Sequence, residues 1–397
     1  MYDIIKNMLR EYFYKKEYKY LYISRFSCKM AGALLSLFSA VVLWRNGIPI
    51  EGILLIYALT FGLMGILTPL HMVLSKRIGV AYTALIGNIC RTISCMLLLF
   101  VDSNWLFLII ISAAISGAIL HPISNTLASK YVQNEHRGKF NSLVFLCNIM
   151  GTILSSIIVT VGITTNNEIA LVMFLALFFA LDVICVKRVD FKAEHAKENT
   201  FKSAFKYLYK GESDIKFICA MRSFAIIERI LLPLYIYLLF TDIVLFTAII
   251  VGSLVVQSML LLIAGRLTDN SNIKTFRNIT ILRIIASVLF IVLRTRWLII
   301  TNKIYTDIVN TTYESTFLTL LQNRIKKSKE SNDFLCVICE MCICFVELIA
   351  LLIFAFIAIY LQEYIFILIF ISSAISMVLI NMQLKKSEVK GECINEV

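Results

Sequence analysis

Long apolar runs recur along the whole chain, and only short polar breaks separate them. A helix needs roughly 20 apolar residues to cross a bilayer, and about twelve runs of this length fit between residues 21 and 384. Hydrophobic residues make up 59% of the 397 residues and charged residues 16%. A soluble domain has roughly 45–50% apolar and about 25% charged residues. The sequence therefore predicts an all-α polytopic membrane protein.

Lys and Arg are distributed unevenly among the polar breaks. They cluster in both tails and in every second connection, for example at Lys76 and Arg77 and at 187–216. Cytoplasmic loops carry the excess of positive residues, so we expect an even number of spans and both termini in the cytoplasm. Arg294 and Arg296 break this pattern. The net charge of +12 thus reflects membrane orientation rather than nucleic-acid binding, and Ile-, Lys- and Asn-rich usage favours the bacterial cytoplasmic membrane.

The longest connection, at residues 186–216, divides the chain at its midpoint. Within it, Phe201, Phe205 and Leu208 share one helical face, which predicts a short amphipathic helix at the membrane surface. We expect five parts along the chain: an interfacial segment at 1–20, a six-helix bundle at 21–187, a linker at 188–214, a second six-helix bundle at 215–384 and a tail at 385–397.

The two halves repeat one another. A short basic loop is followed in each by an apolar run with one central arginine, Arg91 in the first half and Arg283 in the second. Duplicated halves around a central site are a recurring plan of secondary transporters. The repeat predicts two bundles related by a pseudo-two-fold axis.

Several short motifs carry a resemblance to the major facilitator superfamily. The loop GRLTD at 265–269 resembles its G-x-L-x-D loop, and Leu74, Arg77 and Gly79 resemble the L-x-x-R-x-G part of the same signature. Gly117, Pro122 and EHRG at 135–138 resemble its fourth span and the loop that follows. The resemblance covers nearly the whole chain and implies a transporter whose cytoplasmic gate includes Arg77, Gly79, Gly265 and Asp269.

The chain also departs from that family's pattern. Lys76 stands where the loop aspartate is expected, Met72 where a glycine is expected, and Ala113 where the fourth-span arginine is expected. The fifth span has Gly151 but no Gly-Pro pair, so the signature of drug/proton antiporters is missing. These departures argue against a typical proton-driven drug exporter.

Charged residues inside the predicted spans are the candidates for function, because each costs roughly 2.5–3.5 kcal/mol to insert and usually faces a wet cavity or a partner. In the tenth predicted span, 297–323, a polar stripe falls on one helical face at about 100° per residue; it consists of Lys303, Asp307, Asn310, Thr311 and Glu314. In the eleventh, 333–361, Glu340 and Glu347 share a side. We expect the solute to be bound by Lys29, His121, Arg222, Arg229, Asp307 and Asn310, and protons to be carried by Glu314, Glu340 and Glu347.

Simpler roles compete with these assignments. Arg25 and Lys29 lie near the cytoplasmic end of the first span, from which they can extend to water. Glu314 and Glu340 can form a structural ion pair with Arg229, and His121 can be a packing residue.

Four cysteines lie at 336–344, but they do not converge. Zinc needs four tetrahedral ligands, and Cys342 points away from Cys336 on a helix. We expect packed, apolar cysteines, no metal and no cofactor.

Together these features predict a secondary transporter that moves a small solute by alternating access, with an anionic group bound by Arg229 and either Lys29 or Arg222. Carboxylates in a cavity of low dielectric can load and release protons near neutral pH, so coupling to protons is expected. The partners are the solute, protons and membrane lipids, and the chain is expected to work as a monomer.

The solute, the coupling ion and the direction of transport stay open, export included. The alternatives are a non-transporting membrane receptor or scaffold of the same fold, or a transporter of a lipid-like solute. No phosphate-binding glycine loop and no H-E-x-x-H pair is present, so an enzyme is not expected.

Overall fold

The computed structural model describes residues 16–100, 105–131, 137–188, 201–210, 213–269, 273–293, 295–327 and 332–389. Helices account for nearly all of these residues, and the described part of the chain contains no strand. The prediction of an all-α protein is confirmed. The expectations for residues 1–15, for most of the linker before residue 201 and for the acidic part of the EHRG loop fall outside the described residues.

The first half contains α2 (Lys16–Ala33), η1 (Leu34–Phe38), α3 (Ser39–Arg45), α4 (Ile50–Leu67), α5 (Leu70–Ile78), α6 (Val80–Leu99), α7 (Leu106–Tyr131), α8 (Arg137–Thr164) and α9 (Glu168–Arg188). After α10 (Phe201–Lys210), the second half contains α11 (Ser213–Phe240), α12 (Ile243–Asp269), α13 (Ile273–Val292), α14 (Arg296–Lys327), α15 (Asn332–Leu361), η4 (Gln362–Tyr364) and α16 (Ile365–Val389).

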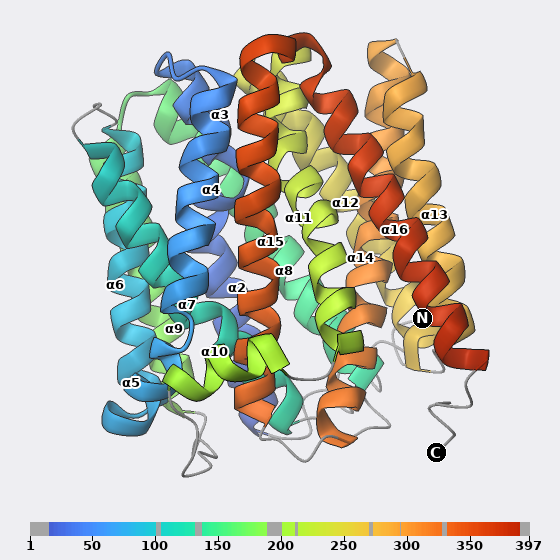
Figure 1. Cartoon of the computed structure of the whole chain (residues 1–397). Helices are drawn as coiled ribbons and strands as arrows, with labels where there is room; N and C mark the ends of the chain where they lie inside the picture. The colour runs from blue at the N-terminus through green and yellow to red at the C-terminus, as the bar shows by residue number, and fades with distance from the viewer. Residues whose placement is uncertain are drawn as a thin grey trace, which may run out of the picture.

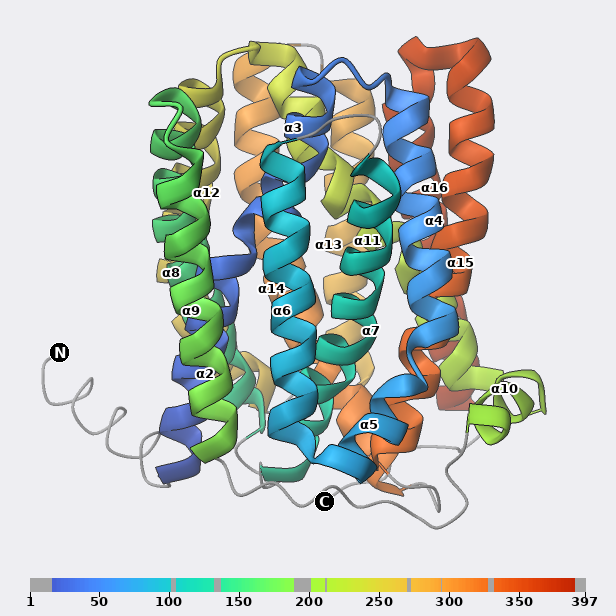
Figure 2. The same cartoon turned by 90° about the vertical axis from the view of Figure 1, so that its left-hand side faces the viewer.

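The long helices stand side by side, and α5 and α10 lie at the lower end of the bundle, where α2 begins and α16 ends (Figures 1 and 2). Eight stretches among the described residues are long and apolar enough to cross a membrane, or nine if the bent pair Lys19–Gly32 and Leu34–Arg45 is one span. One stretch, Phe334–Lys385, holds both α15 and α16. The chain is thus a multi-pass membrane protein, while a count of twelve spans stays a prediction.

The helices pack by the same scheme in both halves. In the first half α2 packs on α8 and α9, α6 packs on α7 and α9, and α4 packs on α7. The second half repeats this with α11 on α15 and α16, α13 on α14 and α16, and α12 on α14. Two large contacts then join the halves, α4 with α15 and α8 with α12. This correspondence supports the predicted pseudo-two-fold relation, which stays a prediction.

Two predicted spans differ from the structure in their course. The first span is bent by 45°, and a π-helical segment, η1, lies between α2 and α3. The second apolar run is divided between two helices, because α4 ends at Leu67 and α5 starts after Pro69. Proline has no N–H to continue the hydrogen-bond ladder but suits the first turn of a new helix, so the chain begins a separate helix there.

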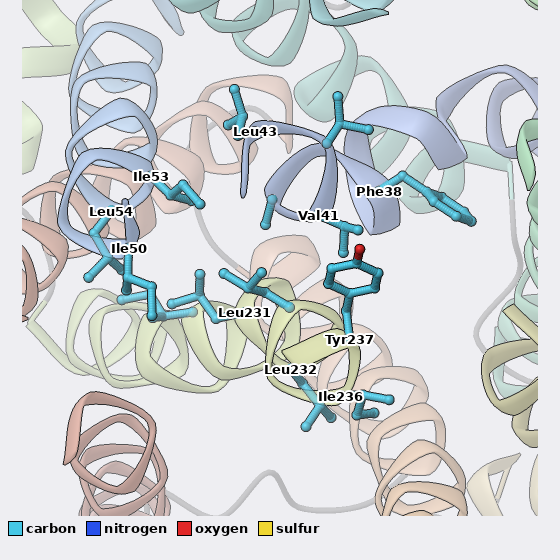
Figure 3. Close-up of a cluster of buried hydrophobic side chains, with 14 of the residues drawn as sticks. Phe38, Val41, Leu43, Ile50, Ile53, Leu54, Leu231, Leu232, Ile236 and Tyr237 are labelled. Atoms are coloured by element: carbon cyan, nitrogen blue, oxygen red, sulfur yellow. The ribbon is translucent and has the colours of Figure 1, made fainter. Parts of the chain in front are cut away.

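A buried apolar cluster joins the two halves near the upper end of the bundle (Figure 3). From the first half it includes Phe38, Val41, Leu43, Ile50, Ile53 and Leu54, and from α11 it includes Leu231, Leu232, Ile236 and Tyr237. Phe246 of α12 packs edge-on against both Phe38 and Tyr237, with ring centroids 5.6 and 6.0 Å away. We call these eleven residues the upper seal.

Candidate solute site between the halves

The centre of the second half contains a buried ion pair. Arg222 of α11 donates to Glu314 of α14, and the two side chains are only 11% and 9% exposed. The guanidinium of Arg222 also stacks over the ring of Phe317, 4.4 Å from its centroid. The structure therefore brings together two of the residues that the sequence singled out.

Arg229 shares the same carboxylate. It lies two turns beyond Arg222 on α11, and its Nη1 is 3.6 Å from Glu314 Oε1. Its side chain is 49% exposed, so Arg229 reaches into accessible space near the middle of its helix. One carboxylate thus serves two guanidinium groups, and part of the positive charge at Arg229 is left uncompensated.

Lys29 brings another cation from the first half. It is half-buried on α2 and close enough to Arg229 for the two charges to repel each other. Within the described part of the chain no carboxylate forms an ion pair with Lys29. Gly151 lets α8 approach α2 at this level, because a Cβ there would lie 2.6 Å from the carbonyl oxygen of Phe26 and 3.2 Å from Lys29 Cβ.

His121 and Glu340 form a contact between the halves. Nδ1 of His121, on α7, lies 3.7 Å from Oε2 of Glu340, on α15. The histidine side chain is 49% exposed and the carboxylate 11%. An ion pair forms here when His121 is protonated.

Glu347 lies seven residues further along α15 and is only 1% exposed. Its Oε1 has no hydrogen-bond partner among the described residues. Its neighbours Cys344 and Leu348 press against Gly65 and Gly62 of α4, where an added Cβ would lie 3.1 and 3.0 Å away. Glu347 is therefore buried next to two residues of the α4–α15 contact, with one carboxylate oxygen that accepts no hydrogen bond from the described residues.

The polar side chains on one face of α14 contact two different helices, α12 and α11. Lys303 and Asp307 bond to each other, and Ser253 of α12 donates to the same carboxylate. Gln257, one turn beyond Ser253, donates to the carbonyl oxygen of Asp307 at 2.9 Å. Asp307 is thus engaged towards α12, about two turns from Glu314, and Asn310 lies half-buried between them.

The residues assigned to the cytoplasmic gate lie at helix ends. Arg77 is exposed in the last turn of α5. Gly79 joins α5 to α6 with φ of +83°, a backbone conformation that residues with a Cβ rarely adopt. Gly265 and Asp269 belong to the last turns of α12, and the side chain of Asp269 lies outside the described part of the chain. Their role in gating stays a proposal.

Four further charged residues have polar partners inside one half. Arg283 pairs with Glu228 at 3.0 Å in full burial, and Ser287 donates to the same carboxylate. Asp182 accepts from Ser24 and, at 2.9 Å, from Asn88. Arg91 donates to Cys28 Sγ and Ser116 Oγ instead. The sequence offered no partner for Glu228.

Sequence reasoning did not single out Ser253, Gln257 or Phe317. Ser253 and Gln257 are polar residues four apart in an apolar run, a spacing that marks one helical face. Among the described residues, no three His, Cys, Asp or Glu side chains are grouped so that they could hold a metal ion. The four cysteines of α15 are buried, and all four lie in apolar clusters.

Comparison with known proteins adds the family. The family model of the Major Facilitator Superfamily matches residues 21–330. The chain belongs to this superfamily. No curated protein sequence is significantly similar to the chain.

Two solved structures have a similar fold. A bacterial homologue of the iron transporter ferroportin, in its outward-facing state, superposes with a TM-score of 0.67 at 13% identity, over 94% of this chain and 99% of that one. The human organic anion transporter MFSD10 (TETRAN) gives a TM-score of 0.64 at 11% identity, over 92% of this chain and 98% of that one. At such identities the likeness shows the fold alone, and membership of the superfamily indicates membrane transport of a small molecule.

Proposed function

We propose that this superfamily member is a secondary active transporter of a small anionic solute, which binds between Lys29 and Arg229. One observation carries the proposal: two cations from opposite halves lie close enough to repel each other, and the carboxylate that Arg229 contacts, on Glu314, is also held by Arg222. An anionic group between Lys29 and Arg229 would attract both halves at once. Solute binding would thereby lower the cost of bringing the halves together, which alternating access requires.

The solute enters from the lower end in the conformation described here. The upper seal joins α3 and α4 to α11 above the site with buried apolar side chains (Figure 3). Under the expected topology, with both termini in the cytoplasm, the lower end is the cytoplasmic side of the bacterial membrane. Opening of the upper seal and closure at the lower end would complete the cycle, and the sign of the solute gradient would set export or uptake.

Glu314, Glu340 and Glu347 are the proposed proton carriers, and Glu314 lies next to the proposed solute site because it contacts Arg229. Glu347 has a buried oxygen without a partner, so a bound proton would remove the cost of burying its charge. Glu340 faces His121 across the halves, where a proton can form or release the contact. Glu314→Gln should abolish uptake driven by a pH gradient and leave solute binding measurable.

A thermal-shift screen against small carboxylates, sulfonates and phosphate esters tests the solute class. A ligand at 100 times its dissociation constant stabilises the folded protein by about 2.7 kcal/mol. The stabilisation should be lost in Lys29→Gln and Arg229→Gln and kept in Arg45→Gln, a control at the exposed upper end. An anion that stabilises both site variants like the wild type would place the site elsewhere. If no anion stabilises the protein, the receptor or scaffold interpretation gains.

A further inference from the structure

The linker helix α10 has two faces with different partners. Its buried side packs on both halves: Ala204 lies in one apolar cluster with Met72 of α5 and with Val337, Ile338 and Met341 of α15. Tyr207 packs edge-on against Phe334, with ring centroids 5.4 Å apart. Lys216 of α11 donates to the carbonyl oxygen of Leu208 at 3.1 Å and so caps the end of the helix. This side of α10 therefore packs on protein.

The opposite side of α10 is basic and aromatic. Lys202, Lys206 and Tyr209 fall within about 60° of one another on the helix, and all three are exposed, Tyr209 by 86%. We call them the basic face of α10. No acidic residue occurs in α10 or in the neighbouring α5, which adds the exposed Lys76 and Arg77. The positive charge of this surface is therefore not neutralised within these two helices.

The position of α10 determines what this surface can meet. The helix lies across the lower end of the bundle, beside the first turns of α15, and extends past the upright helices (Figures 1 and 2). That is the level at which the spans leave the membrane, where Tyr is enriched and Lys and Arg meet headgroups. Anionic lipids attract basic segments that lie next to a membrane.

We propose that the basic face of α10 binds anionic phospholipid headgroups of the leaflet at the lower end. The chemistry matches on two counts, because Lys202 and Lys206 supply the charge and Tyr209 supplies a side chain suited to the headgroup layer. A free soluble phosphate would find the same cations but no bilayer for the tyrosine. The inference concerns lipid and does not depend on the solute proposed above.

Lipid binding would act on the contact between the halves. The buried side of α10 holds Met72 of α5 and the first turns of α15 in one cluster, so a lipid that steadies α10 also steadies this junction. A bilayer rich in anionic lipid would favour conformations in which α5, α10 and α15 stay packed together.

Hydrogen exchange in nanodiscs tests this proposal at α10 itself. The full chain is placed in discs of phosphatidylcholine alone or with phosphatidylglycerol, and exchange of the amides of residues 201–210 is followed. We expect roughly thirtyfold slower exchange with phosphatidylglycerol, the size expected for two lysines near an anionic surface. The difference should disappear in Lys202→Glu/Lys206→Glu and persist in Lys202→Arg/Lys206→Arg. It should also persist in Arg45→Glu/Arg296→Glu, which reverses two exposed charges at the upper end.

Two further measurements test whether the effect is electrostatic and whether it needs lipid. For the wild type, about 1 M salt should abolish the lipid-dependent difference, because screening then acts within about 3 Å. Soluble glycerol phosphate should not slow the exchange in discs of phosphatidylcholine. Equal exchange in both kinds of disc would overturn the proposal, as would slowing that survives charge reversal or high salt.

Discussion

Loss of the Glu314 carboxylate should destabilise the protein more than loss of either arginine that it serves. In Glu314→Gln, Arg222 keeps its burial but loses the carboxylate to which it donates, and Arg229 loses a partner at 3.6 Å. Breaking a buried ion pair by removing one partner costs about 3–5 kcal/mol, since the other charge stays buried without compensation. We expect Glu314→Gln to fall in this range.

Arg222→Gln should cost less, because Glu314 would remain next to Arg229. Half-exposed pairs contribute up to about 1 kcal/mol, so Arg222→Gln should be about 1 kcal/mol milder than Glu314→Gln. The double variant leaves no charge of the buried pair behind, and neutral replacement of such pairs is often nearly without cost. Its loss should therefore lie well below the sum of the two single losses, with a coupling of about 2 kcal/mol or more.

Melting of the purified proteins in one detergent, followed by intrinsic fluorescence, checks this order. Glu314→Gln should melt lowest, Arg222→Gln higher, and the double variant above Glu314→Gln. Glu347→Gln is the matched control, because this acid is equally buried but its Oε1 has no partner to lose. Additive losses in the double variant, or a Glu347→Gln variant as unstable as Glu314→Gln, would refute the reasoning.

Three other substitutions test separate parts of the structure. Gly151→Ala should destabilise the folded protein by about 1–3 kcal/mol through a clash with the backbone of α2. Gly252→Ala, with nothing within 4 Å of its Cβ, should stabilise the folded protein by up to about 1 kcal/mol. The midpoints of denaturant unfolding compare the two variants. Phe38→Ala should weaken the upper seal and increase labelling of the site from the upper side, and unchanged labelling would argue against the seal. Glu228→Gln should cost about 3–5 kcal/mol in thermal stability yet leave the solute affinity of the folded fraction unchanged.

The sequence predicted the fold well, because the feature that decides it is local. Runs of about 20 apolar residues must be helical in a bilayer, and Phe205 and Leu208 marked the linker helix that the structure contains. The bend at η1 and the break at Pro69 were missed. A π-helical turn changes only backbone hydrogen bonds, so it leaves no periodic pattern in the side chains. Pro69 lies within an apolar run whose pattern continues on both sides of it.

Partners of charged residues were harder to predict than the residues themselves. Spacing correctly placed Lys303, Asp307 and Glu314 on one face of α14, but it could not tell that the upper part of this face meets α12 and the lower part meets α11. Which helices touch, and at what height, depends on the packing of the whole bundle. For the same reason Glu228, which lies beside Arg229 in sequence, pairs with Arg283 in the interior of the second half.

The pairs divide into two groups by their place in the fold. Asp182 and the Glu228–Arg283 pair have their partners within one half, so these interactions would persist in the proposed motion of the halves relative to each other. Lys29 faces Arg229, and His121 faces Glu340, across the boundary between the halves. In the proposed rocking motion these boundary interactions would change. A solute or a proton can shift a conformational equilibrium only by its difference in binding between the two states, and the boundary is where such a difference arises.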